Sequence, residues 1–310
     1  MLSSERTRDV APVSWTCPVC EGGRGVVRWP VPEEAVEGGV APAAFRPSSD
    51  RYGRTVGSVV RCLGCGHGSL ARLPDANAMG EAYVDAADPI SLSEEAGQIE
   101  TARRALRLIE RIVRPSSLAD VGCWTGSLLV AASESGWDAC GVDPSQWAVT
   151  RAQERGLHVW AGDFRDPCLG SRTYRAIAMC DVLEHLRDPG DAIEHLRGLV
   201  EPGGLLYLTV PDAGSVVARL LGRRWWSILP MHLQYFTRSS IRRLLEERGF
   251  VVHEIRSHAK VFSARYYAER LHGYSPLLGR LTVKVVEASG LGSRLVAPDL
   301  FDRMQVIASR

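Results

Sequence analysis

The sequence predicts an α/β protein built on a doubly wound, mostly parallel seven-stranded sheet. From residue 100 onward, short apolar segments with strand character alternate with segments whose apolar residues recur at helical spacing. Glycine or proline ends successive helical segments, at Pro115, Gly136, Gly156 and Gly249. Alternation of this kind places parallel strands side by side in one sheet, with helices covering both of its faces.

The individual elements follow from local composition, taken in chain order. A first helix begins at Glu100, with apolar residues three and four positions apart, and Pro115 ends it. The later helices show the same spacing and cover 127–135, 145–155, 189–200 and 241–248. The strands are short and mainly apolar, and they cover 118–121, 139–142, 157–161, 174–180, 205–210, 250–255 and 304–309. The last of these is expected to close the sheet as an edge strand.

Four of the eight cysteines form two closely spaced pairs, Cys17 with Cys20 and Cys62 with Cys65. The two thiolates of a C-x-x-C turn can face one tetrahedral cation, and two such turns complete a four-cysteine zinc site. We therefore expect a structural Zn²⁺ in an N-terminal zinc ribbon, in which residues 21–61 form a long insertion. Reduced surface thiols or a redox pair are the alternatives.

The organisation of the chain follows from these segments. We expect a zinc-ribbon domain over 1–75, a linker and helical lead-in over 76–115, and the α/β domain over 116–310. Two insertions, 211–236 and 257–302, do not fit the alternation, and the second is helical and aromatic. Insertions after the carboxyl ends of strands in an open α/β sheet lie where ligands bind.

Composition and charge exclude several classes of protein. With 45% hydrophobic and 24% charged residues, the chain can bury a globular core. Its 37 basic and 36 acidic residues nearly cancel, so the total charge gives no general affinity for nucleic acid. No apolar stretch is long enough to span a membrane, and the first residues lack the apolar region of a signal peptide. We expect a cytoplasmic protein.

Acidic residues follow three successive strands of the predicted sheet. Asp120 precedes a glycine-bearing turn, whose following helix would present free N–H groups to a ligand. Asp143 ends the second strand, where a carboxylate can accept both hydroxyls of a ribose. Asp163 ends the third, placed to meet the amino group of an adenine, with Phe164 beside the ring. Together these positions predict a nucleoside site.

The turn resembles the first motif of class I S-adenosylmethionine (SAM)-dependent methyltransferases, acidic-x-G-x-G-x-G, with Trp124 in place of the middle glycine. A dinucleotide site would instead need G-x-G-x-x-G. The resemblance implies a Rossmann-like methyltransferase fold with SAM as cofactor, and it assigns Asp143 to the ribose and Asp163 to the adenine. The expected cofactor-binding residues are Asp120, Gly122, Cys123, Trp124, Gly126, Asp143, Pro144, Asp163, Phe164, Cys180 and Asp181.

Further motifs resemble the branch that includes the ubiquinone-biosynthesis O-methyltransferases. The segment Tyr174–Pro189 is similar to the fourth-strand motif of that branch, where the residue matching Cys180 lines the cofactor site. Arg175 replaces the aspartate that usually begins the strand, so no role of that acid is carried over. Residues 202–204 and 232–237 are also typical of the branch, and the similarity covers about 100–256 and the final strand.

Two histidines are candidates for a catalytic base. A hydroxyl acceptor benefits from a positioned base, and histidine suits this task because its reference pKa of about 6.5 lies near operating pH. His185 follows strand four, and His232 lies on the insertion before the next helix; we prefer His232, because a covering segment can exclude water. The alternative is that each fixes a loop by hydrogen bonds. Asp181, Glu184 and His185 could also hold a divalent cation, as in some relatives.

The insertion at 211–236 supplies candidate acceptor-binding residues. Trp225 and Trp226 could form an aromatic wall, with Arg223 meeting an anionic group and Tyr235 nearby. The alternative is that the tryptophans pack the insertion onto the core.

The function expected from these observations is SAM-dependent methyl transfer to a small-molecule acceptor. A hydroxyl in natural-product, saccharide or cell-envelope biosynthesis is the preferred target. The alternatives are an RNA methyltransferase, against which the absence of a basic tract argues, and a non-catalytic methyltransferase-like binding protein. The acceptor, the atom methylated and the oligomeric state are left open.

Overall fold

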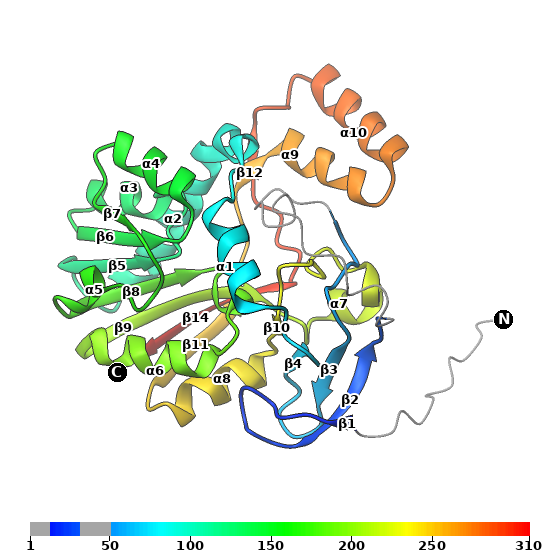
Figure 1. Cartoon of the computed structure of the whole chain (residues 1–310). Coiled ribbons are helices and arrows are strands. Elements are labelled where there is room, and N and C mark those ends of the chain that lie inside the picture. The colour runs from blue at the N-terminus through cyan, green and yellow to red at the C-terminus, as the bar shows by residue number, and fades with distance from the viewer. Residues whose placement is uncertain (1–12, 32–50) are drawn as a thin grey trace.

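The computed structural model describes residues 13–31 and 51–310 (Figure 1). The middle of the expected ribbon insertion, residues 32–50, lies outside the described residues. The largest sheet has seven strands in the order β11-β14-β9-β8-β5-β6-β7. Neighbours from β9 to β7 are parallel, whereas β14 is antiparallel to both β9 and β11. The predicted doubly wound, mostly parallel seven-stranded sheet is confirmed.

The strands of this sheet lie close to the predicted ranges. They are β5 (Ser117–Val121), β6 (Asp138–Asp143), β7 (Val159–Ala161), β8 (Tyr174–Cys180), β9 (Val200–Pro211), β11 (Val251–Ser257) and β14 (Arg303–Ser309). The expectation that the last strand closes the sheet as an edge is wrong, because β14 lies between β9 and β11. Most of β14 is buried, whereas β11 is partly exposed along its length, as an outer strand can be.

Helices cover both faces of the sheet. On one face, α2 (Glu95–Glu110), α3 (Ser127–Glu134) and α4 (Gln146–Glu154) share an apolar core with side chains of β5, β8 and β9. On the other face lie α5 (Pro167–Gly170), α6 (Pro189–Leu199) and α8 (Arg238–Glu247). Helix α2 begins earlier than the predicted Glu100. Glu95 in its first turn complements the helix dipole, a signal that apolar spacing does not detect.

A second sheet joins the N-terminal ribbon to the rest of the chain. Its strands are β1 (Val13–Ser14), β2 (Arg24–Trp29), β3 (Val59–Cys62), β4 (Gly68–Leu70) and β10 (Gln234–Tyr235), in that order and all antiparallel. Strand β10 comes from the insertion at 211–236, so the ribbon and that insertion share one sheet, at the lower right of Figure 1. They also share an apolar core, together with α1 (Ala76–Val84).

The remaining segments gather near the carboxyl ends of the parallel strands, where they line a cavity. The region expected as a linker forms α1 and a 3₁₀ helix, η3 (Pro89–Glu94). The insertion before β14, here called the cap (residues 257–302), holds β12 (Phe262–Ser263), α9 (Ala264–Glu269), η6 (Arg270–Gly273), α10 (Pro276–Ala288) and β13 (Leu295–Val296). Among the described residues, no helix is both long and apolar enough to cross a membrane.

Candidate functional site

The turn formed by residues 122–126 connects β5 to α3. Gly122 and Gly126 have φ values of +75° and +81°, in the left-handed region that favours glycine. A Cβ atom on Gly122 would lie 2.2 Å from Cγ2 of Val182, and one on Gly126 would lie 2.4 Å from Cδ1 of Leu157. Conformation and close packing therefore both require glycine at these two positions.

Trp124 occupies the position of the motif's middle glycine with a φ of +49°, which is rare for a bulky residue. Its backbone N–H donates to Oδ2 of Asp143 at 2.8 Å, and its indole N–H donates to Oγ of Ser91 at 3.1 Å. Its ring centroid lies 5.5 Å from that of Trp147. These contacts hold Trp124 as part of the cavity wall.

Asp143 is buried at the end of β6, and its two oxygens accept the backbone N–H groups of Trp124 and Ser145 at 2.8 and 2.9 Å. A carboxylate offers about four lone-pair sites, so roughly two remain for the hydroxyls of a ribose. Burial raises the pKa of Asp143 to about 6, and burial together with the charge of Asp143 raises the pKa of Asp120 to about 7. Hydroxyl donors from a ligand would therefore stabilise a carboxylate that is costly to ionise here.

All the other predicted cofactor residues except Gly126 line the same cavity, which has a volume of about 1320 Å³. Asp163 is exposed after β7 and accepts the backbone N–H of Arg165 at 2.8 Å, while Phe164 beside it is buried. Gly126 lies outside the lining, at the N-cap of α3. The predicted residues found in the lining are Asp120, Gly122, Cys123, Trp124, Asp143, Pro144, Asp163, Phe164, Cys180 and Asp181.

Aromatic side chains line the rest of the cavity, and apart from Trp226 the sequence analysis did not single them out. Within the cap, Phe262 and Tyr266 stack with ring centroids 4.2 Å apart, and Tyr274 lies 5.2 Å from Tyr52 of the ribbon region. Arg270 lies over the rings of Tyr52 and Tyr266. The available signal was the aromatic composition of the cap. The aromatic lining residues on this side are Tyr52, Tyr83, Trp226, Phe262, Tyr266, Tyr267 and Tyr274.

The two histidines proposed as bases meet at one wall of this cavity, with ring centroids 4.8 Å apart. Nδ1 of His232 lies 2.8 Å from the carbonyl oxygen of Ser227, so it carries the donated proton and Nε2 carries the free lone pair. Nδ1 of His185 lies 2.9 Å from the hydroxyl of Tyr83 and 3.2 Å from the carbonyl oxygen of Met231. Burial lowers the pKa of His185 to about 4 and that of His232 well below 6.5, so both are neutral at neutral pH.

Glu184 completes this cluster. Ligand atoms of Glu184, His185 and His232 lie within 4.8 Å of one another. Glu184 is buried at 1% exposure, and neither of its carboxyl oxygens has a hydrogen-bond partner in the described part of the chain. Burial, with a smaller contribution from Asp181, raises its pKa to about 8. This carboxyl is therefore mostly protonated at neutral pH, and a positive charge placed beside it would favour its ionised form.

Asp181 is engaged elsewhere, although sequence spacing grouped it with Glu184 and His185. It has a φ of +57° and forms ion pairs with Lys260 of the cap and Arg303 of β14. Burial alone would raise its pKa, but the two cations hold that pKa well below the usual range. The third side chain beside Glu184 and His185 is therefore His232, which lies on a distant segment that spacing could not identify.

The predicted acceptor-binding residues do not all reach the cavity. Trp226 lines it, whereas Trp225 is completely buried and its indole N–H donates to Asp302 at 2.9 Å. Tyr235 is buried against Trp29 in the ribbon core, with ring centroids 5.2 Å apart. Arg223 is exposed and donates to the carbonyl oxygen of Pro30 at 2.8 Å. Trp225, Tyr235 and Arg223 thus pack the insertion against its neighbours. For Trp225 this is the alternative given above, that a tryptophan packs the insertion onto the core.

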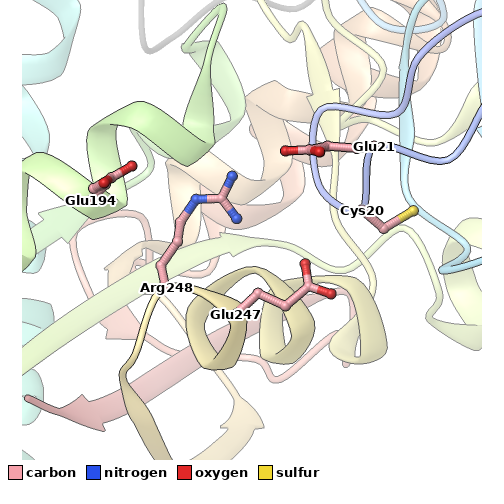
Figure 2. Close-up of a pocket in the computed structure, with 5 residues that line it drawn as sticks. All are labelled: Cys20, Glu21, Glu194, Glu247 and Arg248. Atoms are coloured by element: carbon pink, nitrogen blue, oxygen red, sulfur yellow. The ribbon is translucent and has the colours of Figure 1, made fainter.

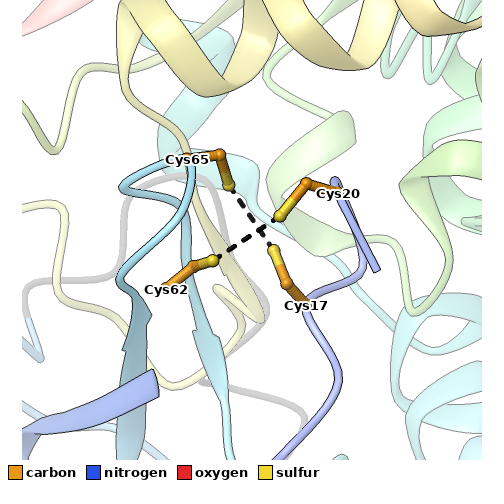
Figure 3. Close-up of side chains that lie close together, drawn as sticks. All are labelled: Cys17, Cys20, Cys62 and Cys65. Carbon is orange, nitrogen blue, oxygen red and sulfur yellow. Dashed lines mark hydrogen bonds between the residues drawn. The ribbon is translucent and has the colours of Figure 1, made fainter. Parts of the chain in front are cut away.

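The four cysteines of the two C-x-x-C turns converge on one point (Figure 3). Sγ of Cys17 lies 3.6 Å from Sγ of Cys65, and Sγ of Cys20 lies 3.6 Å from Sγ of Cys62. A tetrahedral zinc with Zn–S bonds of about 2.3 Å would separate its sulfurs by about 3.8 Å. The four sulfurs therefore fit a single zinc ion.

A shallow polar groove of about 400 Å³ lies beside the first cysteine turn (Figure 2). Three carboxylate side chains and the guanidinium of Arg248 line it together with Cys20. Arg248 also donates from Nε to the carbonyl oxygen of Gly190 at 2.9 Å, which ties α8 to the start of α6. The groove includes none of the residues predicted for the cofactor or the acceptor.

Comparison with known proteins shows which family the chain belongs to. A model described as a methyltransferase domain matches residues 93–255, more than half of the chain. An uncharacterized 37.1 kDa protein in transposon TN4556 of Streptomyces fradiae is 30% identical over 42% of this chain and 41% of its own length. The ubiquinone biosynthesis O-methyltransferase of Paraburkholderia xenovorans is 26% identical over 46% of this chain and 71% of its own length. The chain thus spans less than half of the first relative.

Solved structures with a similar arrangement include two methyltransferases. Magnesium protoporphyrin IX methyltransferase from Synechocystis, solved with bound S-adenosylhomocysteine (SAH), is 18% identical with a TM-score of 0.46, covering 72% of this chain and 88% of that one. A SAM-dependent methyltransferase from Mesorhizobium loti is also 18% identical with a TM-score of 0.46, covering 68% and 98%. From the extent of the family match, which includes the turn at 122–126 and the segment Tyr174–Pro189, the chain belongs to the methyltransferase-domain family.

Proposed function

We propose that this protein transfers the methyl group of SAM to a hydroxyl of a small-molecule acceptor, in natural-product, saccharide or cell-envelope biosynthesis in the cytoplasm. One observation carries the proposal. A single cavity connects the carboxylates at the strand ends, which suit a nucleoside, to a buried histidine whose Nε2 is free to accept a proton. The similarity to ubiquinone biosynthesis O-methyltransferases supports oxygen as the target atom.

The residues of this chain would orient the acceptor and receive its proton. SAM, when bound, supplies a methyl group already activated on a sulfonium, so the protein need not provide an electrophile. As the new O–CH₃ bond forms and the S–CH₃ bond breaks, Nε2 of His232 takes the hydroxyl proton. The imidazolium so formed lies within 4.8 Å of the Glu184 carboxyl, and its positive charge favours the ionised form of that carboxyl. The buried setting excludes water and strengthens this interaction.

The lining on the acceptor side of the cavity suits a bulky acceptor with apolar or ring-shaped surfaces. The whole cavity of about 1320 Å³ exceeds the roughly 300–1,000 Å³ of common small-molecule pockets, as a site for SAM and an acceptor together requires. Rings of Phe262, Tyr266 and Tyr267 offer flat faces to such a molecule. The ribbon contributes Tyr52 to the same wall, so it participates in enclosing the acceptor.

The direct experiment supplies purified protein with SAM labelled in its methyl group and a panel of hydroxylated aromatic, polyketide and sugar acceptors. Formation of SAH together with a labelled ether would support the proposal. Transfer to RNA, with affinity that falls steeply as salt rises, would favour the RNA methyltransferase alternative. Failure to bind SAH would favour the non-catalytic alternative.

A second candidate role for the histidine wall of the cavity is to bind a divalent cation through Glu184, His185 and His232. The favouring observation is the donor set itself, two imidazoles and an unpartnered buried carboxylate within 4.8 Å. Addition of Mg²⁺ or Mn²⁺ to zinc-containing protein separates the two roles. Turnover that depends on the added ion would show that the three residues bind a cation. Turnover that is independent of the ion would support His232 as the base.

Asp143→Ala is expected to weaken SAH binding by about 1.5–3 kcal/mol, because it removes charge-assisted hydrogen bonds to the ribose. Isothermal titration with SAH measures this loss. Asp166→Ala provides a control, since Asp166 lines the same cavity and its Oδ1 accepts the nearby N–H of Cys168. Equal affinity of Asp143→Ala and the wild type would remove the ribose assignment.

SAH affinity is expected to decrease as pH falls through about 6. The pKa of Asp143 in the free protein is raised to about 6 by burial, and the ribose hydroxyls bind its charged form. At pH 5 only about one tenth of Asp143 would be ionised, so affinity should be about tenfold weaker than at pH 7.5. Asp143→Asn should bind weakly with a flatter pH dependence. A wild-type affinity that is constant between pH 5 and 7.5 would contradict this assignment.

A further inference from the structure

The zinc ribbon contacts the histidine wall of the cavity through a short segment, residues 231–234. On one side, Gln234 pairs with Ser69 of β4, and the N–H of Leu70 donates to the carbonyl oxygen of Leu233 at 3.0 Å. On the other side, the N–H of Leu233 donates to the carbonyl oxygen of Glu184 at 2.9 Å. The segment, which contains His232, therefore lies between strand β4 of the ribbon and the loop that carries His185.

A side-chain relay reinforces this backbone connection. Nε2 of His67, two residues after Cys65, lies 3.0 Å from Oε1 of Gln234, so the imidazole donates and the amide oxygen accepts. The amide N–H₂ of Gln234 donates to the carbonyl oxygen of Leu186 at 2.9 Å, directly after His185. His67 and Gln234 are 0% and 2% exposed, so water cannot replace these bonds.

The cysteine turn itself is attached to the same region. The N–H of Cys62 donates to the carbonyl oxygen of His67 at 2.7 Å, which fixes His67 to the second C-x-x-C turn. Oγ of Ser239 in α8 donates to the carbonyl oxygen of Cys65 at 3.2 Å. A metal that orders this turn would therefore order His67, and through it Gln234.

The cofactor half of the cavity does not share the hydrogen bonds that connect the histidine wall to the ribbon. In the described part of the chain, the turn 122–126 forms hydrogen bonds with β6, with Ser91 of η3, with Arg155 and with the following helix α3. None of those partners belongs to the ribbon. Loosening the ribbon should thus affect the acceptor half while leaving cofactor binding nearly unchanged.

From this arrangement, and resting on the proposed function, we propose that the zinc ribbon positions His185 and His232 through His67 and Gln234. Gln234 is accordingly a positioning residue: its amide touches neither substrate nor cofactor but sets where the two imidazoles stand. The ribbon would thus keep the two histidines on the acceptor side of the site in position, in addition to stabilising its own fold.

Gln234→Leu in the full-length, zinc-loaded protein tests the proposal. Leucine has a similar size but can bond neither His67 nor the loop. We expect SAH affinity within twofold of wild type, one zinc per chain, and turnover reduced about 10- to 100-fold, the scale of a small misplacement of a reacting group. We also expect the imidazole ¹⁵N resonances of His185 and His232 to shift or broaden. Ser69→Ala, a buried change on the neighbouring strand β4 that leaves the relay intact, should behave as wild type.

Two further variants make the outcome decisive. His67→Leu cuts the same relay at its ribbon end, so the double variant with Gln234→Leu should be little worse than either single one. If Gln234→Leu does not fold, Gln234→Glu keeps an acceptor for His67 and replaces the N–H₂ group that donates to Leu186 and Arg187 by a carboxyl oxygen. Unchanged histidine resonances in a folded variant, or loss of SAH affinity in parallel with turnover, would overturn the proposal. The resonance measurement needs no acceptor, so it decides the point even if methyl transfer to a hydroxyl is not observed.

Discussion

His232→Ala is expected to lower turnover by about 10²- to 10⁴-fold, the range that a positioned general base contributes. The imidazole is already oriented, because its Nδ1 proton is donated to Ser227, and it is neutral, because burial lowers its pKa well below 6.5. Removing it takes away the proton acceptor without touching the carboxylates that suit the ribose. Initial rates with labelled SAM give the loss, and titration with SAH should show affinity within about twofold of wild type.

His185→Ala separates the two histidines. His185 contacts Tyr83 and Met231 through Nδ1 and follows the strand-four wall of the cofactor side. Removing its whole imidazole, unlike the displacement expected in Gln234→Leu, would open that wall, so it should affect both turnover and SAH affinity. His253→Ala serves as the control, since His253 lies on the exposed outer strand β11 and bonds Ser309. Near-normal turnover of His232→Ala with a true acceptor would show that the base lies elsewhere or that none is needed.

The main sheet was predictable because its strands and helices are specified locally. Strand β8 was predicted with its observed bounds, and the glycines that end α3 and α4 have positive φ values, as helix-ending glycines often do. The place of β14 was not predictable in this way. Its order in the sheet depends on pairing with β9 and β11, strands that are far from it in sequence, and apolar composition alone does not distinguish an inner strand from an edge.

The convergence of Asp120, Asp143 and Asp163 on one cavity was predictable for the same reason, since each lies at the carboxyl end of a strand of the parallel sheet. The acceptor side was not. Trp225 and Trp226 are adjacent in sequence, yet one is buried against Asp302 and the other faces the cavity. Tyr83 and Lys260, which meet His185 and Asp181, belong to segments whose position depends on tertiary packing. The spacing of residues in the sequence cannot predict such contacts.

Cys62→Ser is expected to abolish zinc binding and to destabilise the protein by more than the roughly 0.5–3 kcal/mol of an ordinary substitution. Structural zinc sites contribute apparent binding energies of about 10–16 kcal/mol in small domains, and that energy is available only when all ligands are present. Cys62 ends β3 and its sulfur lies 3.6 Å from that of Cys20, so serine would remove one of four converging ligands. Metal analysis should find one zinc per chain in the wild type and less than one in the variant.

The consequence for stability follows from what the two turns hold together. The cysteines belong to the apolar core formed by α8 and the main sheet, so an unfolded ribbon would expose part of that core as well as its own. Thermal unfolding should therefore begin at a lower temperature in Cys62→Ser. Cys168→Ser, which changes a cysteine remote from the cluster, should leave both zinc content and unfolding unchanged. A Cys62→Ser variant that retains a full zinc and the wild-type unfolding temperature would show that these four cysteines are not a metal site, and that the ribbon is held by packing alone.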